Sequence, residues 1–126
     1  MVDIEKQVAY WQQGATEDWD VAKTLLDEDK IRHGLFFAHL ALEKVLKALV
    51  CRHTGKLAPR THNLMRLSEL TNLTLDETQF DTLADMNAFN LEGRYPDQLL
   101  PSPSTEEANE YLKRADEVYQ WLMSQL

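Results

Sequence analysis

Two lysines, Lys44 and Lys47, stand three residues apart inside the most hydrophobic stretch of the sequence, which runs from Phe36 to Val50. In a helix these positions lie on neighbouring turns and face the same way. An ammonium group in an otherwise apolar helix needs either a path to water or an anion as its partner. The spacing therefore suggests a site for an anion such as phosphate. The alternative is that both lysines extend to solvent over their own apolar stems and that Lys47 forms an ordinary helical pair with Glu43.

The charges of the chain are unevenly distributed. The net charge of the 126 residues is -8, but eight basic residues and the single acid Glu43 lie between Lys30 and Arg66, which gives this segment a net charge of +7 and leaves -15 for the remainder. The basic segment also contains all four histidines, which are His33, His39, His53 and His62. Such a division favours contact with nucleic acid or another polyanion. The alternative is that the basic and acidic segments neutralise one another within one fold or across a dimer.

Length and composition describe one globular domain. The chain has 44% hydrophobic and 27% charged residues, which is typical of a soluble protein. No apolar run is long enough to cross a bilayer, and the acidic amino terminus lacks the features of a secretory signal, so we expect a cytoplasmic protein. The single cysteine, Cys51, cannot form an intrachain disulfide, and we interpret it as a packing residue at the end of the apolar helix.

Hydrophobic periodicity predicts five helices and no strand. The predicted helices cover residues 3–28, residues 31–53 before Gly55, a short segment capped by Thr61 or Asn63, a segment beginning near Thr74 or Asp76, and the residues that follow Ser104. Three pairs have the spacing of a capping box, namely Thr74 with Glu77, Asp76 with Gln79, and Ser104 with Glu107. Short connections between long amphipathic helices predict an all-α protein, an up-and-down antiparallel bundle of about five helices forming a single domain over residues 1–126.

Several of these segments occur together in a known family. They are the stretch from Trp19 to Val50 with Phe36-Phe37 and Glu43-Lys44-Val45-Leu46-Lys47-Ala48, the segment Pro59-Arg60-Thr61-His62-Asn63-Leu64, the tetrapeptide Arg94-Tyr95-Pro96-Asp97, and the final helix capped by Ser104. In this order they resemble the HEPN domain family of small helical prokaryotic proteins. The resemblance covers nearly the whole chain.

The resemblance implies a helical bundle that forms homodimers and is often encoded beside a minimal nucleotidyltransferase, the two acting in many cases as a toxin-antitoxin pair. Some members resemble metal-independent ribonucleases, which carry an arginine followed after four to six residues by a histidine. Here no histidine follows Arg94, and Arg60 and His62 are too close together. Arg32 and His39 have the spacing but lie in the second predicted helix, and we interpret it as coincidence. Catalytic residues are therefore not assigned.

The leading interpretation is a HEPN-like homodimer with an electropositive cleft for a nucleotide or RNA phosphate, lined by Lys44, Lys47, Arg94 and His62. The lysines would act as point charges and Arg94 as a fork for phosphate oxygens. For His62 the alternative is a histidine that caps a helix or anchors a loop. The homodimer is also expected because the second helix is too continuously apolar for a small monomer to cover.

No metal or cofactor is predicted, because the histidines lack a ligand spacing and no Gly-rich phosphate loop is found. Two other functions remain open. One is a metal-independent ribonuclease toxin, restrained by the nucleotidyltransferase, in which His62 is the general base and Arg94 the cation. The other is a protein-interaction subunit without a nucleotide ligand, whose basic strip docks an acidic protein.

Overall fold

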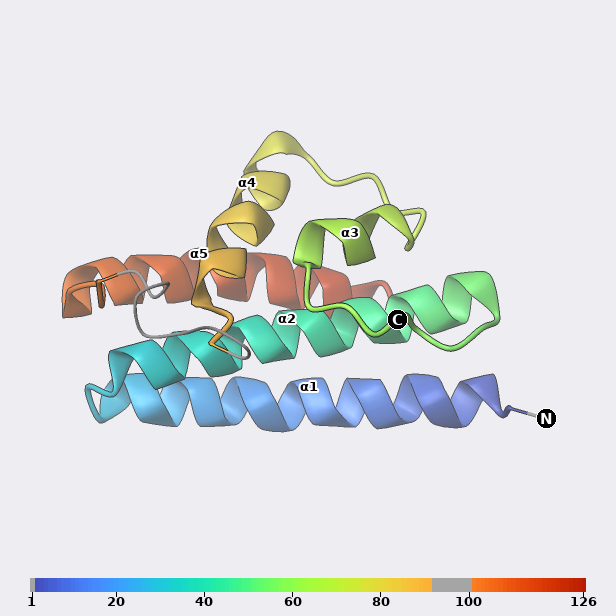
Figure 1. Cartoon of the computed structure of the whole chain (residues 1–126), viewed down its shortest axis with the longest axis horizontal. Helices are drawn as coiled ribbons and strands as arrows, with labels where there is room; N and C mark the ends of the chain where they lie inside the picture. The colour runs from blue at the N-terminus through green and yellow to red at the C-terminus, as the bar shows by residue number, and fades with distance from the viewer. Residues whose placement is uncertain (1, 92–100) are drawn as a thin grey trace.

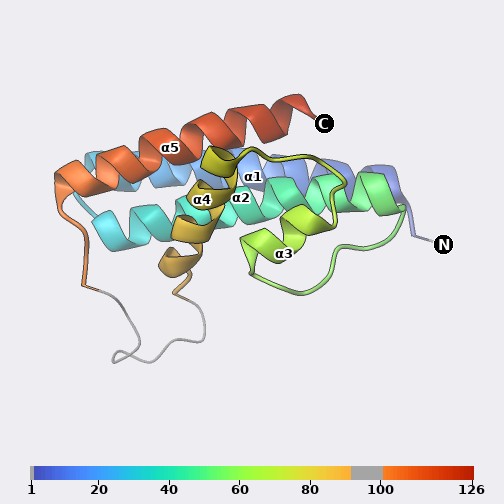
Figure 2. The same ribbon diagram turned by 90° about the horizontal axis from the view of Figure 1, so that it is seen from above.

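The computed structural model describes residues 2–91 and 101–126. Its elements are α1 (Ile4–Asp27), α2 (Ile31–Thr54), α3 (Leu64–Glu69), α4 (Glu77–Met86), the 3-10 helix η1 (Asn87–Phe89) and α5 (Thr105–Ser124). The described part contains five α-helices and no strand, which confirms the predicted all-α bundle. Helices α1 and α2 form an antiparallel hairpin, α5 lies along it, and the shorter α3 and α4 lie across one side of α2 (Figures 1 and 2).

Local signals in the sequence set the helix ends. The side chain of Asp76 accepts from the backbone N–H of Gln79, and Gln79 bonds back to Asp76, so this pair rather than Thr74 with Glu77 forms the capping box of α4. Ser104 and Glu107 form the predicted box at α5. Of the two candidates for α3, Asn63 is the cap. Gly55 ends α2 with φ +68°, where only glycine is unstrained.

The hairpin between α1 and α2 depends on close packing at its turn. Asp29 has φ 62°, a left-handed conformation that reverses the chain within three residues. Gly34, in the first turn of α2, lies directly against Leu26, and a Cβ at this position would approach the Leu26 side chain to 2.7 Å. The absence of a side chain at Gly34 therefore leaves room for Leu26 between the two helices at the turn.

Helix α2 is the central element of the core. From Ala41 to Cys51, Lys44 is the one residue that is not buried. Side chains from all the other helices cover it, and they belong to one hydrophobic cluster with Trp19 of α1, Leu67 of α3, Leu83 of α4 and Leu122 of α5. The rings of Trp19 and Tyr119 stack 4.7 Å apart and join α1 to α5.

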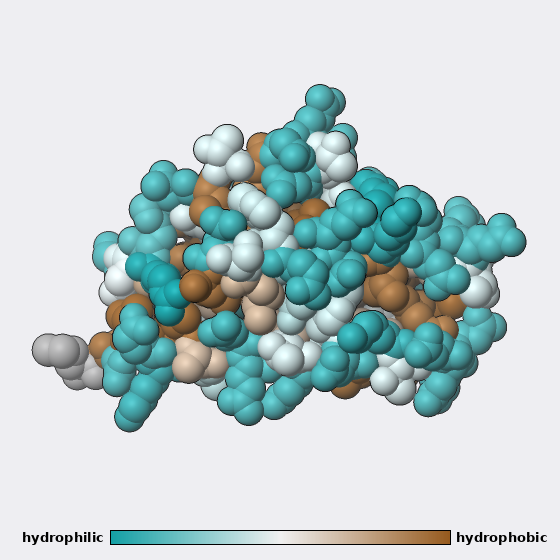
Figure 3. Space-filling view, turned by 180° about the vertical axis from the view of Figure 1, so that it is seen from behind, coloured by the Kyte–Doolittle hydropathy of each residue, from teal (hydrophilic) through white to brown (hydrophobic). Residues whose placement is uncertain are grey.

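This covering changes the argument for a dimer. Among the described residues five large hydrophobic side chains are exposed, namely Val2, Tyr10, Val21, Leu57 and Phe80, and none belongs to α2. On the face seen in Figure 3, hydrophobic side chains form separate patches among hydrophilic ones. From Ala41 to Cys51 the apolar surface of α2 is therefore covered within one chain, whereas Phe36, Phe37 and Leu40 are only half-buried. The continuous apolar run is thus only in part a reason to expect a homodimer.

Candidate functional site

Glu43 is the centre of a polar cluster inside the bundle. It lies on α2 between His39 and Lys47, four residues from each, so that all three face the same side of the helix. Its Oε2 accepts a hydrogen bond from Lys47 Nζ at 3.1 Å, and its Oε1 lies 4.0 Å from His39 Nδ1. Glu43 and Lys47 keep 5% and 7% of their side-chain surface exposed, and His39 keeps none. A carboxylate with a histidine and a lysine in reach is thus held in a largely dry environment.

His62 joins this cluster from the loop between α2 and α3. Its Nδ1 is 2.8 Å from Glu43 Oε1, and its backbone carbonyl accepts a hydrogen bond from His39 Nε2 at 3.0 Å. His62 therefore attaches the loop to α2 through both its side chain and its backbone carbonyl. This fits the interpretation of His62 as a histidine that anchors a loop. The His62 side chain nevertheless remains 46% exposed, so one edge of the ring stays within reach of solvent.

A polar pocket lies beside this exposed edge. It has a volume of about 240 Å³ and is lined by His62 and the amides Asn63, Asn87 and Asn90. Asn87 holds the pocket together, since its Oδ1 accepts from the backbone N–H of Leu64 at 2.9 Å and its Nδ2 donates to Asn63 Oδ1 at 3.1 Å. Because Asn87 follows α4, these bonds fix the end of α4 against the beginning of α3.

The two lysines that drew attention in the sequence point to different partners. Lys47 is engaged by Glu43 and also lies 5.0 Å from the centre of the Trp11 ring, so its ammonium group is used inside the protein. Lys44 instead forms a 2.8 Å ion pair with Asp18 of α1. The two lysines therefore contact different acids among the described residues, and Arg94 lies outside them.

Lys44 borders a second pocket, between α1 and α2. This pocket has a volume of about 270 Å³, and Tyr10, Gln13, Gly14 and Glu17 line it with Lys44. Gly14 leaves room for the lysine, because a Cβ there would lie 3.0 Å from Lys44 Cδ. The Lys44 side chain is 27% exposed and its Asp18 partner 12%, so the ammonium group is accessible but already neutralised.

The described residues show neither a metal centre nor an activated thiol. Across residues 2–91 and 101–126 no cluster of three or more histidines, cysteines or acids is arranged to hold a metal ion. Burial raises the pKa of the Cys51 thiol, which a hydrogen bond with the Ala58 backbone offsets in part, so the reactive thiolate is disfavoured. None of the helices in the described part combines the length and the hydropathy needed to cross a membrane.

Chemically, the site offers an imidazole held by a carboxylate. A histidine that bonds a carboxylate through one ring nitrogen has the other nitrogen fixed in direction, where it accepts a proton or, once protonated, donates to an anion. Lys47 balances the charge of Glu43, so the cluster carries a net positive charge when His62 is protonated. This is the arrangement expected for a group that meets a phosphate or moves a proton near one.

Sequence reasoning identified His62 but missed the residues that support it. The spacing of Glu43 and Lys47 predicts only an ordinary helical pair, although a lone acid inside a buried helix and a basic segment is itself a signal of a charge cluster. No signal in the sequence points to Asn87 and Asn90, because tertiary packing of α4 against α3 brings them to His62 from about 25 residues away.

Comparisons with known proteins give one family model and two solved structures of similar fold. The family model described as HEPN domain matches residues 8–126. The crystal structure of TT1696 from Thermus thermophilus is 21% identical, with a TM-score of 0.78, and the alignment covers 95% of this chain and 98% of that one. The structure of ST0689, described as an archaeal HEPN homologue, is 18% identical with a TM-score of 0.72, covering 99% and 98%. No curated protein matches the chain.

Proposed function

Since the chain belongs to the HEPN domain family, we propose that it is a homodimeric module that binds a nucleotide or RNA phosphate in the pocket beside His62. We further propose that it works as the partner of a minimal nucleotidyltransferase in a pair of the toxin-antitoxin type. The family resemblance supports the partner and the dimer. The geometry around Glu43 supports the ligand and its place.

One observation carries the proposal, and it is the contact between Glu43 and His62. Burying a carboxylate is costly, and a small domain retains such a group where its partners are close and its charge has a use. Here the 2.8 Å contact with Glu43 directs the imidazole, while its other edge borders a pocket of amide groups. An imidazolium and amide N–H groups donate hydrogen bonds, and phosphate oxygens accept them.

The remaining predicted ligands take secondary places in the proposal. Lys44 adds positive charge near the surface, but its ammonium group also pairs with Asp18. Lys47 acts through Glu43 by balancing the carboxylate rather than by touching phosphate. Arg94 is proposed as a further phosphate ligand on the resemblance alone.

Fluorescence anisotropy tests the ligand and its site. The probes are fluorescein-labelled AMP and a labelled single-stranded RNA of about ten nucleotides. We expect His62→Gln to weaken binding about tenfold or more, because a hydrogen bond to a charged group contributes roughly 1.5–3 kcal/mol. The slope of log affinity against log salt should fall by about 0.7 if one RNA phosphate contact is lost.

His33→Gln is the matched control, since His33 is an exposed histidine of the same basic segment that lies outside the pocket. Equal weakening by both variants would mean diffuse attraction and would refute the pocket. Loss of binding in Lys44→Ala and Arg94→Ala, with Lys113→Ala unchanged, would support the full set of predicted ligands. A parent protein that binds neither probe would favour the interaction subunit without a nucleotide ligand.

The carboxylate and imidazole pair also favours a second candidate function, a metal-independent ribonuclease. A general base that takes the proton of a ribose hydroxyl must be held in a fixed direction, and Glu43 orients His62 in this way. The family's arginine-to-histidine spacing is missing, however. Expression without a partner, followed by measurement of growth and RNA integrity, tests this function. Toxicity with RNA cleavage that disappears in His62→Gln but persists in His33→Gln would place the enzyme first.

The assembly part of the proposal is tested separately. Light scattering at micromolar concentration should give twice the mass of the 126-residue chain, and a nucleotidyltransferase encoded by a neighbouring reading frame should co-purify with it. A monomer mass would remove any site built across two subunits, while leaving the His62 pocket to be judged by the binding assay.

A further inference from the structure

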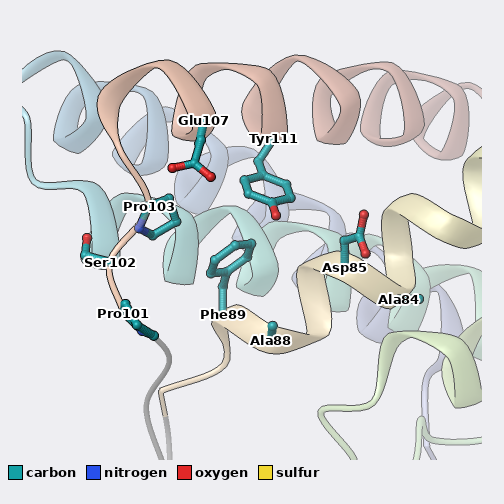
Figure 4. A pocket seen from close by; sticks show the side chains of 9 residues that line it. All are labelled: Ala84, Asp85, Ala88, Phe89, Pro101, Ser102, Pro103, Glu107 and Tyr111. Carbon is teal, nitrogen blue, oxygen red and sulfur yellow. The ribbon is translucent and has the colours of Figure 1, made fainter.

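Another cavity lies away from His62, where the end of α4 and η1 face the beginning of α5. It has a volume of about 490 Å³. Figure 4 shows the rings of Phe89 and Tyr111 at its centre, with the carboxylates of Glu107 and Asp85 on either side. The short helix η1 separates it from the His62 pocket, because Asn87 lines one pocket and Phe89 the other.

The aromatic groups give this pocket a rigid wall. The ring centroids of Phe89 and Tyr111 are 5.0 Å apart with the planes inclined at 70°, so the edge of one ring meets the face of the other. Pro103 adds a third apolar surface beside Glu107. A flat group of limited size finds apolar contact on several sides here.

The charged groups of this pocket exclude one class of ligand and favour another. Hydrogen bonds from the Ser104 backbone and side chain lower the pKa of Glu107, so this carboxylate is ionised at neutral pH. Asp85 supplies a second carboxylate from α4, and Glu110 stands beside Glu107 in an adjoining cavity. Two cations stand near these three acids, namely Arg114 and, in a cavity that shares Phe89 and Pro103 with this pocket, Arg32. The acids remain in excess, which disfavours a phosphate and favours a cation.

Arg114 shows which cation suits the pocket. Its Nη2 lies 2.8 Å from Asp85 Oδ2, and its guanidinium carbon lies 5.9 Å from the centre of the Tyr111 ring. One guanidinium is thus already held between an aromatic ring and a carboxylate at the rim. Glu107, on the opposite side of the same aromatic pair, has no cation as partner among the described ion pairs.

We infer that the pocket formed by Phe89, Tyr111, Asp85 and Glu107 binds an arginine side chain presented by a basic segment of a partner protein. A planar guanidinium stacks on an aromatic ring and binds a carboxylate with two parallel N–H groups, whereas the lysine ammonium is a hydrated point charge. The acidic rim continuing to Glu110 favours further basic residues in that segment. This inference does not depend on the ligand of the His62 pocket, because the two sites take opposite charges.

Residue-resolved NMR of the ¹⁵N-labelled whole chain tests the inference. The probe is N-acetyl-arginine amide, and its matched neutral control is N-acetyl-citrulline amide, which has the same shape without the charge. We expect saturable shifts of the amide signals of Phe89, Glu107 and Tyr111 with the arginine probe and none with citrulline. N-acetyl-lysine amide should bind more weakly.

Variants then assign the contacts. Glu107→Gln keeps the capping hydrogen bonds of α5 and should weaken binding of the arginine probe about threefold to fivefold, as expected for one exposed charge contact. Tyr111→Leu should weaken it similarly, whereas Arg114→Gln should strengthen it by releasing Asp85. Glu117→Gln, which removes an exposed charge from the same helix outside the pocket, should leave the affinity unchanged.

Three results would overturn the inference. Equal weakening by Glu107→Gln and Glu117→Gln would mean that the attraction belongs to the acidic surface as a whole. Equal affinity for the citrulline and arginine probes would mean that the charge of the ligand does not contribute to binding in this pocket. Shifts at Phe89 and Tyr111 caused by AMP and not by arginine would assign the pocket to a nucleobase.

Discussion

Replacing Lys47 by methionine should destabilise the protein strongly, because it removes one member of a buried ion pair. Methionine fills nearly the same space, so the change is chiefly electrostatic. Glu43 and Lys47 are 5% and 7% exposed, which places them in the class where loss of one partner costs about 3–5 kcal/mol. We expect about 3 kcal/mol, the lower end of this range, because His62 still contacts Glu43 at 2.8 Å.

Such a loss is a large fraction of the roughly 5–15 kcal/mol that stabilises a single domain, and it should lower Tm by roughly 10–20 °C. Urea unfolding followed by circular dichroism measures it. Lys23→Met is the control, since it makes the same substitution in the exposed pair with Asp20 and should cost at most about 0.5 kcal/mol. The double variant Glu43→Gln with Lys47→Met should recover part of the loss. A loss below about 1 kcal/mol for Lys47→Met would show that water reaches this pair and would refute the buried cluster.

Three further outcomes follow from separate features. Gly34→Ala should destabilise the protein by about 1–3 kcal/mol in urea unfolding, despite the better helix propensity of alanine, because its Cβ would meet Leu26 at 2.7 Å. Cys51 should react with a thiol reagent far more slowly in the native protein than in urea, because burial raises the pKa of its thiol. The free energy of unfolding should also fall as the pH rises above the ordinary thiol pKa of about 8.5, since the unfolded chain loses the thiol proton at lower pH than the folded protein. The pKa of Glu107 is lowered, so the stability that its ionised form contributes is present above the ordinary glutamate pKa and is lost as the pH falls through the folded value. The difference in free energy of unfolding between wild type and Glu107→Gln should therefore shrink toward low pH.

The helices were predictable from the sequence because their signals are local. Capping residues such as Ser104 and Asp76 act on backbone groups three residues away, and Gly55 needs only its own left-handed conformation. Spacing alone does not decide between Asp76 and Thr74 as the cap of α4, because both pairs have the required separation. Burial of α2 from Ala41 to Cys51 depends on the packing of four other helices, which periodicity alone does not describe.

The candidate site was predictable only in part, because its partners come from distant segments. The spacing of Lys44 and Lys47 places them on adjoining turns, but three positions leave a difference of about 60° around the helix. This difference directs Lys44 to Asp18 of α1 and Lys47 to Glu43. Nothing in the sequence pairs His62 with Glu43, since 19 residues of helix and loop separate them. Asn87 reaches the pocket because of the angle at which α4 crosses, which is a property of the packed fold.

The attachment of the α2–α3 loop to Glu43 and His39 has a consequence for motion. Helices α1, α2 and α5 form the long body of the bundle, while α3 has six residues and α4 ten. Short elements at one side of a bundle are those expected to open without global unfolding. If α3 and α4 detach together, they carry Asn63 and Asn87 away and separate His62 from its carboxylate, so the pocket should exist only in the closed form. Amide hydrogen exchange should then show α3 and α4 opening as one unit, with slower exchange in the middle of α2.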